Sequence, residues 1–212
     1  MVCVYTLLMS YPYLRPRFKI YPGEGKDIAV AVTVLTLSFF LVISPLPFHI
    51  TSSLFDILYL LLVSLLAVIT AFFTHEMAHK YMAIKYGYPA AFKKWNMGLL
   101  LALISSFFGF IFAAPGAVYI YGYPSRRENG IISSAGPATN LIVGFVLLTL
   151  SYFTGHLLYI SLRYIAQLNF FISFFNLLPI PPMDGIKILG WRIDIYALLI
   201  ILSLAGLVFT YL

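Results

Sequence analysis

Two histidines and one glutamate, placed within five positions, are the residues of this chain whose types and spacing most clearly predict chemistry. His75, Glu76 and His79 form the pattern H-E-x-x-H. On a helix, side chains at positions i and i+4 project from one face, so both imidazoles can bind the same zinc ion. Glu76 between them can act as a general base on water. We therefore predict a site for one Zn²⁺ per chain, with Glu76 as the catalytic residue.

The composition places this pattern in a membrane. The 212 residues are 62% hydrophobic and 9% charged, whereas soluble domains carry about 25% charged residues. The stretch from Ile57 to Phe73, just before the motif, contains no charge. An unpaired glutamate at membrane depth is energetically expensive, so an accidental match is a poor explanation of the motif. The net charge of +6 fits basic residues that flank membrane spans, and we expect no nucleic-acid partner.

Six apolar segments are expected to build the protein around the motif, since about 20 residues are needed to cross a bilayer. They run over residues 28–46, 54–86, 97–114, 131–153, 157–178 and 195–212. Residues 1–27 are expected to form an N-terminal interfacial segment, and 28–212 a single transmembrane domain whose core motifs lie at about 55–190. The predicted fold class is an all-α polytopic membrane protein with five or six full spans and a small β-strand or re-entrant element.

A catalytic zinc ion normally has three protein ligands and one open position, so a third ligand is needed. The pattern H-E-x-x-H-x-x-G-x-x-H is excluded, because Met82 and Lys85 stand where it needs glycine and histidine. Asp56 is 19 residues before His75 on the same helix, which is about 28 Å away. The other candidates are expected at the opposite membrane face or in solvated segments: His49, His156, Glu24, Asp27, Glu128 and Asp194. Asp184, at a proline-broken helix end, remains as the predicted ligand, and a solvated turn aspartate is the alternative.

The basic residues predict how the chain lies in the membrane. If residues 97–121 enter the bilayer and return on the same side, every basic residue except Arg163 falls on one side, which the charge rule assigns to the cytoplasm. The lengths allow this, since about 16 helical residues span about 24 Å and about eight extended residues span about 26 Å. A full crossing is the alternative. We expect a multi-pass protein of the cell membrane, with its N-terminus and the opening of its site on the cytoplasmic side.

Three motifs, taken in order, resemble those of the site-2 protease family of intramembrane zinc metalloproteases. They are His75-Glu76-Met77-Ala78-His79, then Gly136-Pro137-Ala138-Thr139-Asn140, then Asn176-x-x-Pro179 followed by Asp184-Gly185. The resemblance implies regulated proteolysis of transmembrane proteins, with His75, His79 and Asp184 as zinc ligands and Glu76 as the base. The chain departs from the family where the usual Leu-Asp-Gly-Gly reads Met183-Asp184-Gly185-Ile186, and where 97–114 is longer than the family's simple hairpin.

Further residues are candidates for contact with such a substrate. Asn140 could donate a hydrogen bond to a substrate carbonyl or to a developing oxyanion, although helix packing alone explains its neighbours Gly136 and Gly144. A run of β-branched and aromatic residues is expected to form a strand whose edge could hold an unwound substrate. The run comprises Ala117, Val118, Tyr119, Ile120 and Tyr121. A structural ribbon that plugs the bundle is the alternative.

Two other classes of function are weighed beside proteolysis. A membrane metal-binding protein or transporter without hydrolytic activity would use several ligands along a path, and the few acids and histidines within the spans disfavour it. A protease-like protein without activity would lack the base or a ligand, and neither is lost here. A polar stripe either lines a water path or bonds helices together: Asn169, Ser173 and Asn176. The expected partners are a transmembrane protein substrate and the lipid bilayer, and the sequence indicates no oligomeric state.

Overall fold

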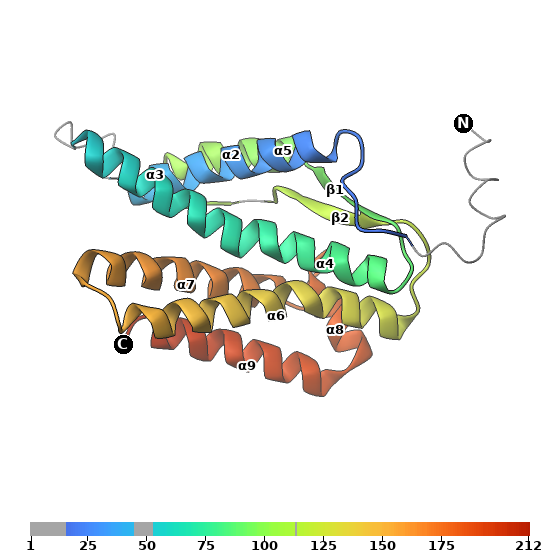
Figure 1. The fold of residues 1–212 in the computed structure, drawn as a ribbon. Coiled ribbons are helices and arrows are strands. Elements are labelled where there is room, and N and C mark those ends of the chain that lie inside the picture. Colours follow the sequence, from blue (N-terminus) through green and yellow to red (C-terminus); the bar gives the residue numbers. More distant parts are fainter. Residues whose placement is uncertain (1–15, 45–52, 113) are drawn as a thin grey trace.

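The computed structural model describes residues 16–44, 53–112 and 114–212, which form a helical bundle with a two-stranded sheet inserted into it. In Figure 1, α2 and α5 lie on one side of the sheet and α4 on the other, while α6 to α9 form the second half of the bundle. The elements are α2 (Glu24–Ile43), α3 (Leu54–Val68), η1 (Ile69–Phe73), α4 (Thr74–Lys85), β1 (Ala90–Lys94), α5 (Asn96–Ser106), β2 (Gly116–Ile120), α6 (Arg126–Ser151), α7 (His156–Asn176), α8 (Asp184–Trp191) and α9 (Ile193–Phe209).

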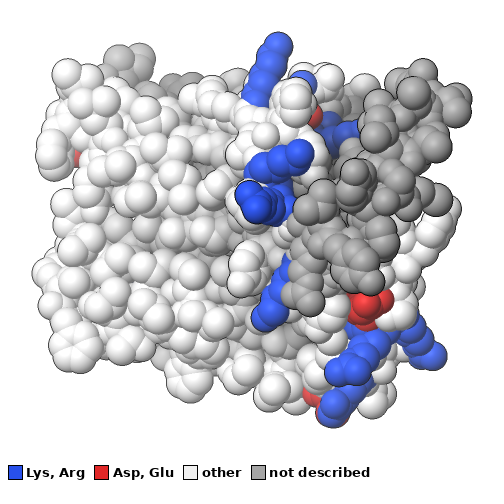
Figure 2. Space-filling model, turned by 45° about the vertical axis from the view of Figure 1, so that its right-hand side comes forward, with Lys and Arg blue, Asp and Glu red and all other residues white. Residues whose placement is uncertain are grey.

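Four of the described helical segments are long and apolar enough to cross a membrane, judged by length and composition. They are α2, the continuous helix Leu54–Lys85, α6 and α7. The helices α5 and α9 are apolar but shorter. The expectation of a mainly helical chain with a small strand element is confirmed, whereas the count of five or six full spans stays a prediction. Figure 2 shows lysine and arginine side chains gathered over one end of the visible face, while most of the remaining described surface is uncharged.

A change of helical pitch precedes the H-E-x-x-H motif. The segments α3, η1 and α4 form one continuous helix, and η1 is a π-helix of five residues within it. A π-helical turn holds extra backbone and is frequent at functional sites, because it rotates the residues that follow it. Polar side chains of the neighbouring helices bind this turn: the Asn140 amide donates to the Ala71 carbonyl at 3.0 Å, and the Asn169 amide to the Thr70 hydroxyl at 3.2 Å. The face that carries the two histidines is thus fixed by α6 and α7.

The region 97–121 returns to the point where it begins. Its helix α5 ends at Ser106 rather than near Ala114, and the backbone N–H of Trp95 donates to the Pro115 carbonyl at 3.0 Å. The strand β2 then pairs antiparallel with β1, a strand that the sequence did not reveal. This is the path that the re-entrant interpretation requires. The depth of the segment in a bilayer stays a prediction.

A buried ion pair joins the N-terminal part of the bundle to α4. Lys80, directly after His79, is fully buried and donates to the Glu24 carboxylate at 2.6 Å and to the Lys19 carbonyl at 2.7 Å. The same Glu24 oxygen accepts the backbone N–H of Phe92 in β1 at 2.9 Å. The expectation that Glu24 lies in a solvated segment is therefore wrong, because Lys80 and two backbone donors compensate its charge inside the protein. His49 and residues 1–15 of the expected interfacial segment lie outside the described residues.

Breaking this pair should destabilise the protein strongly. Lys80→Met leaves the Glu24 carboxylate buried without its counter-charge, and we expect the free energy of unfolding to fall by about 3–5 kcal/mol. The double variant Glu24→Gln/Lys80→Met removes the uncompensated charge and should recover most of the loss. Unfolding by SDS titration in mild-detergent micelles measures both values. Equal stability of Lys80→Met and the wild type would contradict the role of the pair.

Candidate metal centre

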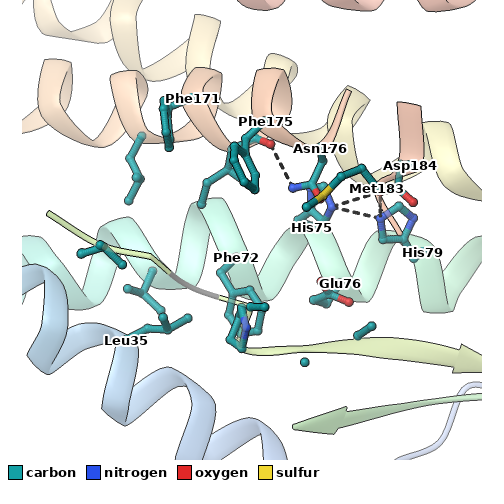
Figure 3. A pocket seen from close by; sticks show the side chains of 18 of the residues that line it. Leu35, Phe72, His75, Glu76, His79, Phe171, Phe175, Asn176, Met183 and Asp184 are labelled. Carbon is teal, nitrogen blue, oxygen red and sulfur yellow. Dashed lines mark hydrogen bonds and ion pairs between the residues drawn. The ribbon is translucent and has the colours of Figure 1, made fainter. Parts of the chain in front are cut away.

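A cavity of about 640 Å³ lies between α4, the free edge of β2 and α7. Figure 3 shows its apolar side chains, among them Leu35, Phe72, Phe171 and Phe175, and the polar group at its other end. That polar group consists of His75, Glu76, His79, Asn176 and Asp184. The motif therefore faces an apolar space within the bundle.

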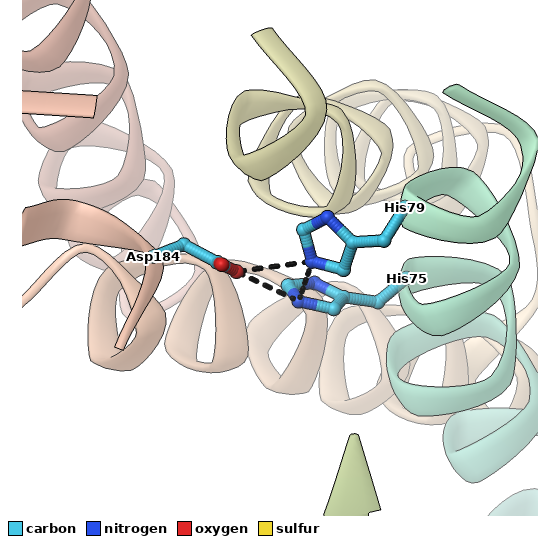
Figure 4. Close-up of side chains that lie close together, drawn as sticks. All are labelled: His75, His79 and Asp184. Carbon is cyan, nitrogen blue, oxygen red and sulfur yellow. Dashed lines mark hydrogen bonds and ion pairs between the residues drawn. The ribbon is translucent and has the colours of Figure 1, made fainter. Parts of the chain in front are cut away.

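The three predicted ligands meet at one point, as Figure 4 shows. The Nε2 atoms of His75 and His79 are 3.0 Å apart, and one Asp184 carboxylate oxygen lies 3.6 Å from the first and 3.0 Å from the second. All three side chains are buried. Among the described residues, this is the one group of three or more histidine, cysteine or acidic side chains close enough to share a metal ion.

This donor set fits zinc. Ligand atoms at 2.0–2.1 Å from a tetrahedral zinc ion are about 3.3 Å apart, which is close to the separations between these atoms. The Nδ1 atom of His79 lies 2.8 Å from the Ile132 carbonyl. A carbonyl only accepts, so Nδ1 carries the proton and Nε2 presents its lone pair to the centre. Two imidazoles and one carboxylate leave a fourth position for water or substrate.

Gly136 makes room for the two imidazoles. A Cβ atom at this position would lie 2.4 Å from Nε2 of His79 and 2.6 Å from Nε2 of His75. The backbone of α6 therefore lies directly behind the rings, and any side chain at Gly136 would push them out of place. Further along α6, Gly144 instead accommodates the ring of Phe170, which a Cβ atom would approach to 2.7 Å.

Asp184 is brought to the histidines by the break between α7 and α8. It is the first residue of α8, and the next residue, Gly185, lies so close to the turn that a Cβ atom would be 2.1 Å from the Leu177 carbonyl. Lys187 donates to the second Asp184 oxygen at 3.1 Å, which leaves the first oxygen facing the histidines. Lys187 was not predicted from the sequence as part of the site, although its i, i+3 spacing from Asp184 is a usable signal.

Glu76 projects from α4 toward the sheet, next to the face that carries the two histidines (Figure 3). One carboxylate oxygen, Oε2, accepts the backbone N–H of Val118 in β2 at 3.1 Å. The carboxylate lines the same cavity as the three ligands. A carboxylate held beside a metal centre in a shared cavity can exchange protons with water and with a substrate bound there.

The remaining predicted residues are placed as follows. Asn140 is fully buried, donates to backbone carbonyls and is not among the residues that line the cavity, so its contact with a substrate stays a prediction. Ala117, Val118 and Ile120 line the cavity. Tyr119 and Tyr121 are exposed, and the Lys93 ammonium lies 5.4 Å and 5.9 Å from the centres of their rings.

The polar stripe of α7 serves mainly to join helices. The Ser173 hydroxyl bonds with the Ser203 hydroxyl at 2.8 Å and donates to the Pro137 carbonyl at 3.2 Å. The Asn169 amide reaches the π-helical turn, and the Asn176 amide donates to the carbonyl of Ile172 within its own helix. Of the three, Asn176 also lines the cavity.

Comparisons with known proteins point to one enzyme class. No family model matches the chain, and no solved structure matches it significantly. The chain is 45% identical over 141 residues to "Putative zinc metalloprotease MJ0611" of Methanocaldococcus jannaschii, a match that covers 65% of this chain and 74% of that protein. It is 34% identical over 149 residues to "Putative zinc metalloprotease YwhC" of Bacillus subtilis, covering 58% of this chain and 66% of that protein.

Proposed function

The chain belongs to a zinc metalloprotease family, and from this premise we propose that it is an intramembrane protease of the site-2 type, which hydrolyses peptide bonds of transmembrane substrates. The observation that carries the proposal is the meeting of His75, His79 and Asp184 at one buried point, with Glu76 beside them in an apolar cavity. The four helices with the length and composition of membrane spans support the location in a bilayer.

The residues of the site divide the reaction between them. His75, His79 and Asp184 would hold the zinc ion, which when bound would supply a Lewis acid for the substrate carbonyl and for water. Val118 holds Oε2 of Glu76, so Oε1 is the oxygen placed to take a proton from the attacking water. Glu76 then passes this proton to the nitrogen of the leaving amine. The apolar walls of the cavity keep bulk water away, which strengthens these electrostatic interactions.

The substrate must be extended where it is cut, because a helix hides its carbonyls in its own hydrogen bonds. We assign this task to the edge of β2 that lines the cavity, where an unwound segment can add as a further strand. The segment from Ala117 to Tyr121 supplies the strand, and the apolar side chains of α7 lie across the cavity from it.

The basic ends of two helices support the proposed orientation in the membrane. The helix α4 ends at Lys85 and α6 begins at Arg126, and these two basic termini lie at the same end of the bundle (Figure 1). Arg163 is buried elsewhere, where it donates to the Tyr159 hydroxyl at 2.8 Å and to the Phe209 carbonyl at 2.9 Å. By the charge rule, the basic end is cytoplasmic, and water and product exchange with the cytoplasm.

A metal-binding protein or transporter without hydrolytic activity is the alternative. Such a protein would need successive ligand groups along a path, whereas the described residues hold a single group. It would also have no use for Glu76, which is not one of the three ligands. The position of this carboxylate beside the centre therefore favours hydrolysis.

The test compares the wild type with Glu76→Gln, using purified protein, zinc and a single-span test substrate in detergent or vesicles. We expect the cleavage rate of Glu76→Gln to fall by about 10²–10⁴-fold, because the amide takes no proton from water, while about one zinc per chain is retained. Asp56→Asn is the matched control, since Asp56 caps the far end of the same helix and its amide form can still cap. Equal cleavage by Glu76→Gln and the wild type would exclude a protease mechanism that uses this base.

A further inference from the structure

The edge of β2 that faces away from β1 pairs with no other strand among the described residues. The backbone N–H groups of Trp95 and Tyr121 donate to the Pro115 and Pro89 carbonyls of the opposite strand segment. In an antiparallel ladder, residue pairs alternate between bonded and non-bonded. The register pairs Trp95 with Pro115 and Pro89 with Tyr121 as bonded pairs, so counting inward from either pair makes every second pair non-bonded. The non-bonded pairs are those of Gly116, Val118 and Ile120. The N–H and C=O groups of these three residues therefore point away from β1, and all three line the cavity.

Glu76 occupies the middle of this edge. Its Oε2 accepts the Val118 N–H at 3.1 Å, which is where the carbonyl oxygen of an added strand would otherwise bind. The outer edge of β1 is held in the same way, since the Phe92 N–H donates to Glu24 at 2.9 Å. The central pair of the sheet is thus fixed at both edges by carboxylates, one of them the proposed catalytic base.

We propose that the Val118 N–H positions Glu76 and so determines which peptide bond of the substrate is cut, namely the bond that faces Val118. The inference rests on the proposed function, in which the β2 edge holds an extended substrate. Gly116 and Ile120 then remain to bind the substrate backbone. They are four residues apart, or about 13 Å along the strand, so the substrate is held on both sides of the bond that faces the base.

In this arrangement, the strand β2 both binds the substrate backbone and holds the catalytic base. The base is attached to the same backbone that binds the substrate, so a shift of the strand moves both together. Val118 is a positioning residue here, since its N–H acts through Glu76. Because the contact is made by the backbone of Val118, changes to the backbone test it directly.

The experiment compares Val118→Pro with the matched control Ile120→Pro. Proline removes the N–H group, and it is tolerated on a free strand edge because the ladder to β1 is kept. For Val118→Pro we expect kcat to fall about 10- to 100-fold, with KM nearly unchanged and cleavage spread over neighbouring bonds, because the base loses a charge-assisted hydrogen bond. For Ile120→Pro we expect KM to rise, while the same bond is cut with nearly unchanged kcat. Mass spectrometry of the products identifies the bonds.

Zinc content and unfolding are measured on each variant. If Val118→Pro unfolds, an ester analogue of Val118 replaces it, because the ester removes the N–H group without adding a ring. Cleavage of the same single bond with unchanged kcat would overturn the inference while leaving the protease intact. Equal effects of both variants on KM alone would also overturn it. No cleavage by the wild type would instead refute the proposed function. Zinc retained by a Val118 variant that cuts slowly and at scattered bonds would support the inference.

Discussion

Gly136→Ala is expected to weaken zinc binding by at least about 100-fold while leaving the fold intact. The added Cβ atom would lie 2.4 Å from Nε2 of His79 and 2.6 Å from Nε2 of His75, so both imidazoles must turn away. Outer-shell changes weaken metal binding about 10- to 100-fold, and the displacement of two ligands should weaken it by at least about 100-fold. Alanine also raises helix propensity by about 0.5–1 kcal/mol over glycine, so α6 itself should not be weakened.

The measurement is zinc content after dialysis against a weak chelator, together with thermal unfolding of the zinc-free protein. Gly144→Ala is the matched control, because it is also a glycine of α6 in close contact with a neighbouring helix, but a Cβ there presses on Phe170 of α7 rather than on the metal centre. We expect Gly144→Ala to lose stability and keep zinc. Full zinc content in Gly136→Ala would show that the rings have more room than their distances from α6 allow.

Asp184→Ala is expected to eliminate both zinc and cleavage. Two histidines alone leave a catalytic site one ligand short of the usual three, so the zinc content should fall from about one per chain to background. Asp194→Ala, nearby in sequence, is the control. Asp194 forms an exposed ion pair with Arg192, and such pairs contribute at most about 1 kcal/mol, so its loss should change neither zinc content nor activity. Full zinc binding by Asp184→Ala would require a third ligand other than this aspartate.

The metal centre could be predicted from the sequence, because the positions of the two histidines depend on helix geometry alone. His75 and His79 stand one helical turn apart, so their convergence needs only a helix, and the uncharged run before them marks the helix as apolar. Asp184 was reached by excluding the other acids, an argument about which segments lie too far away. The structure places these three side chains together. The long helix was predicted nearly to its ends, at 54–86 against Leu54–Lys85.

The contacts that support the centre could not be predicted from the sequence, because they join residues far apart in the chain. The pairing of Glu24 with Lys80 spans 56 positions, and nothing in either local sequence indicates it. The strand β1 contains two lysines and reads as a polar loop until β2 is available to pair with it. The role of Gly136 depends on how closely α6 approaches α4, which is a tertiary property. The π-helical turn likewise depends on polar groups supplied by α6 and α7.

The position of Asn140 shows why the direction of a polar side chain is hard to predict from spacing alone. From the sequence, Asn140 could contact the substrate or serve helix packing. In the structure, its amide nitrogen bonds to the Ala71 carbonyl and to the Asn169 carbonyl, at 3.0 Å and 3.4 Å. These contacts place Asn140 between three helical segments behind the site. The spacing of residues within α6 could not show whether the Asn140 side chain points toward η1 and α7 or toward the cavity.

The separation of the ligands along the chain also determines when the centre can exist during synthesis. Asp184 follows His79 by 105 residues, and α5, the sheet, α6 and α7 are all made in between. At growth rates of about 5–20 residues per second, the histidines wait about 5 to 20 s for their third ligand. Throughout that interval the growing polypeptide carries the base without a complete centre. A hydrolase that matures among other unfolded membrane chains thus becomes competent only after most of its own helices have been made.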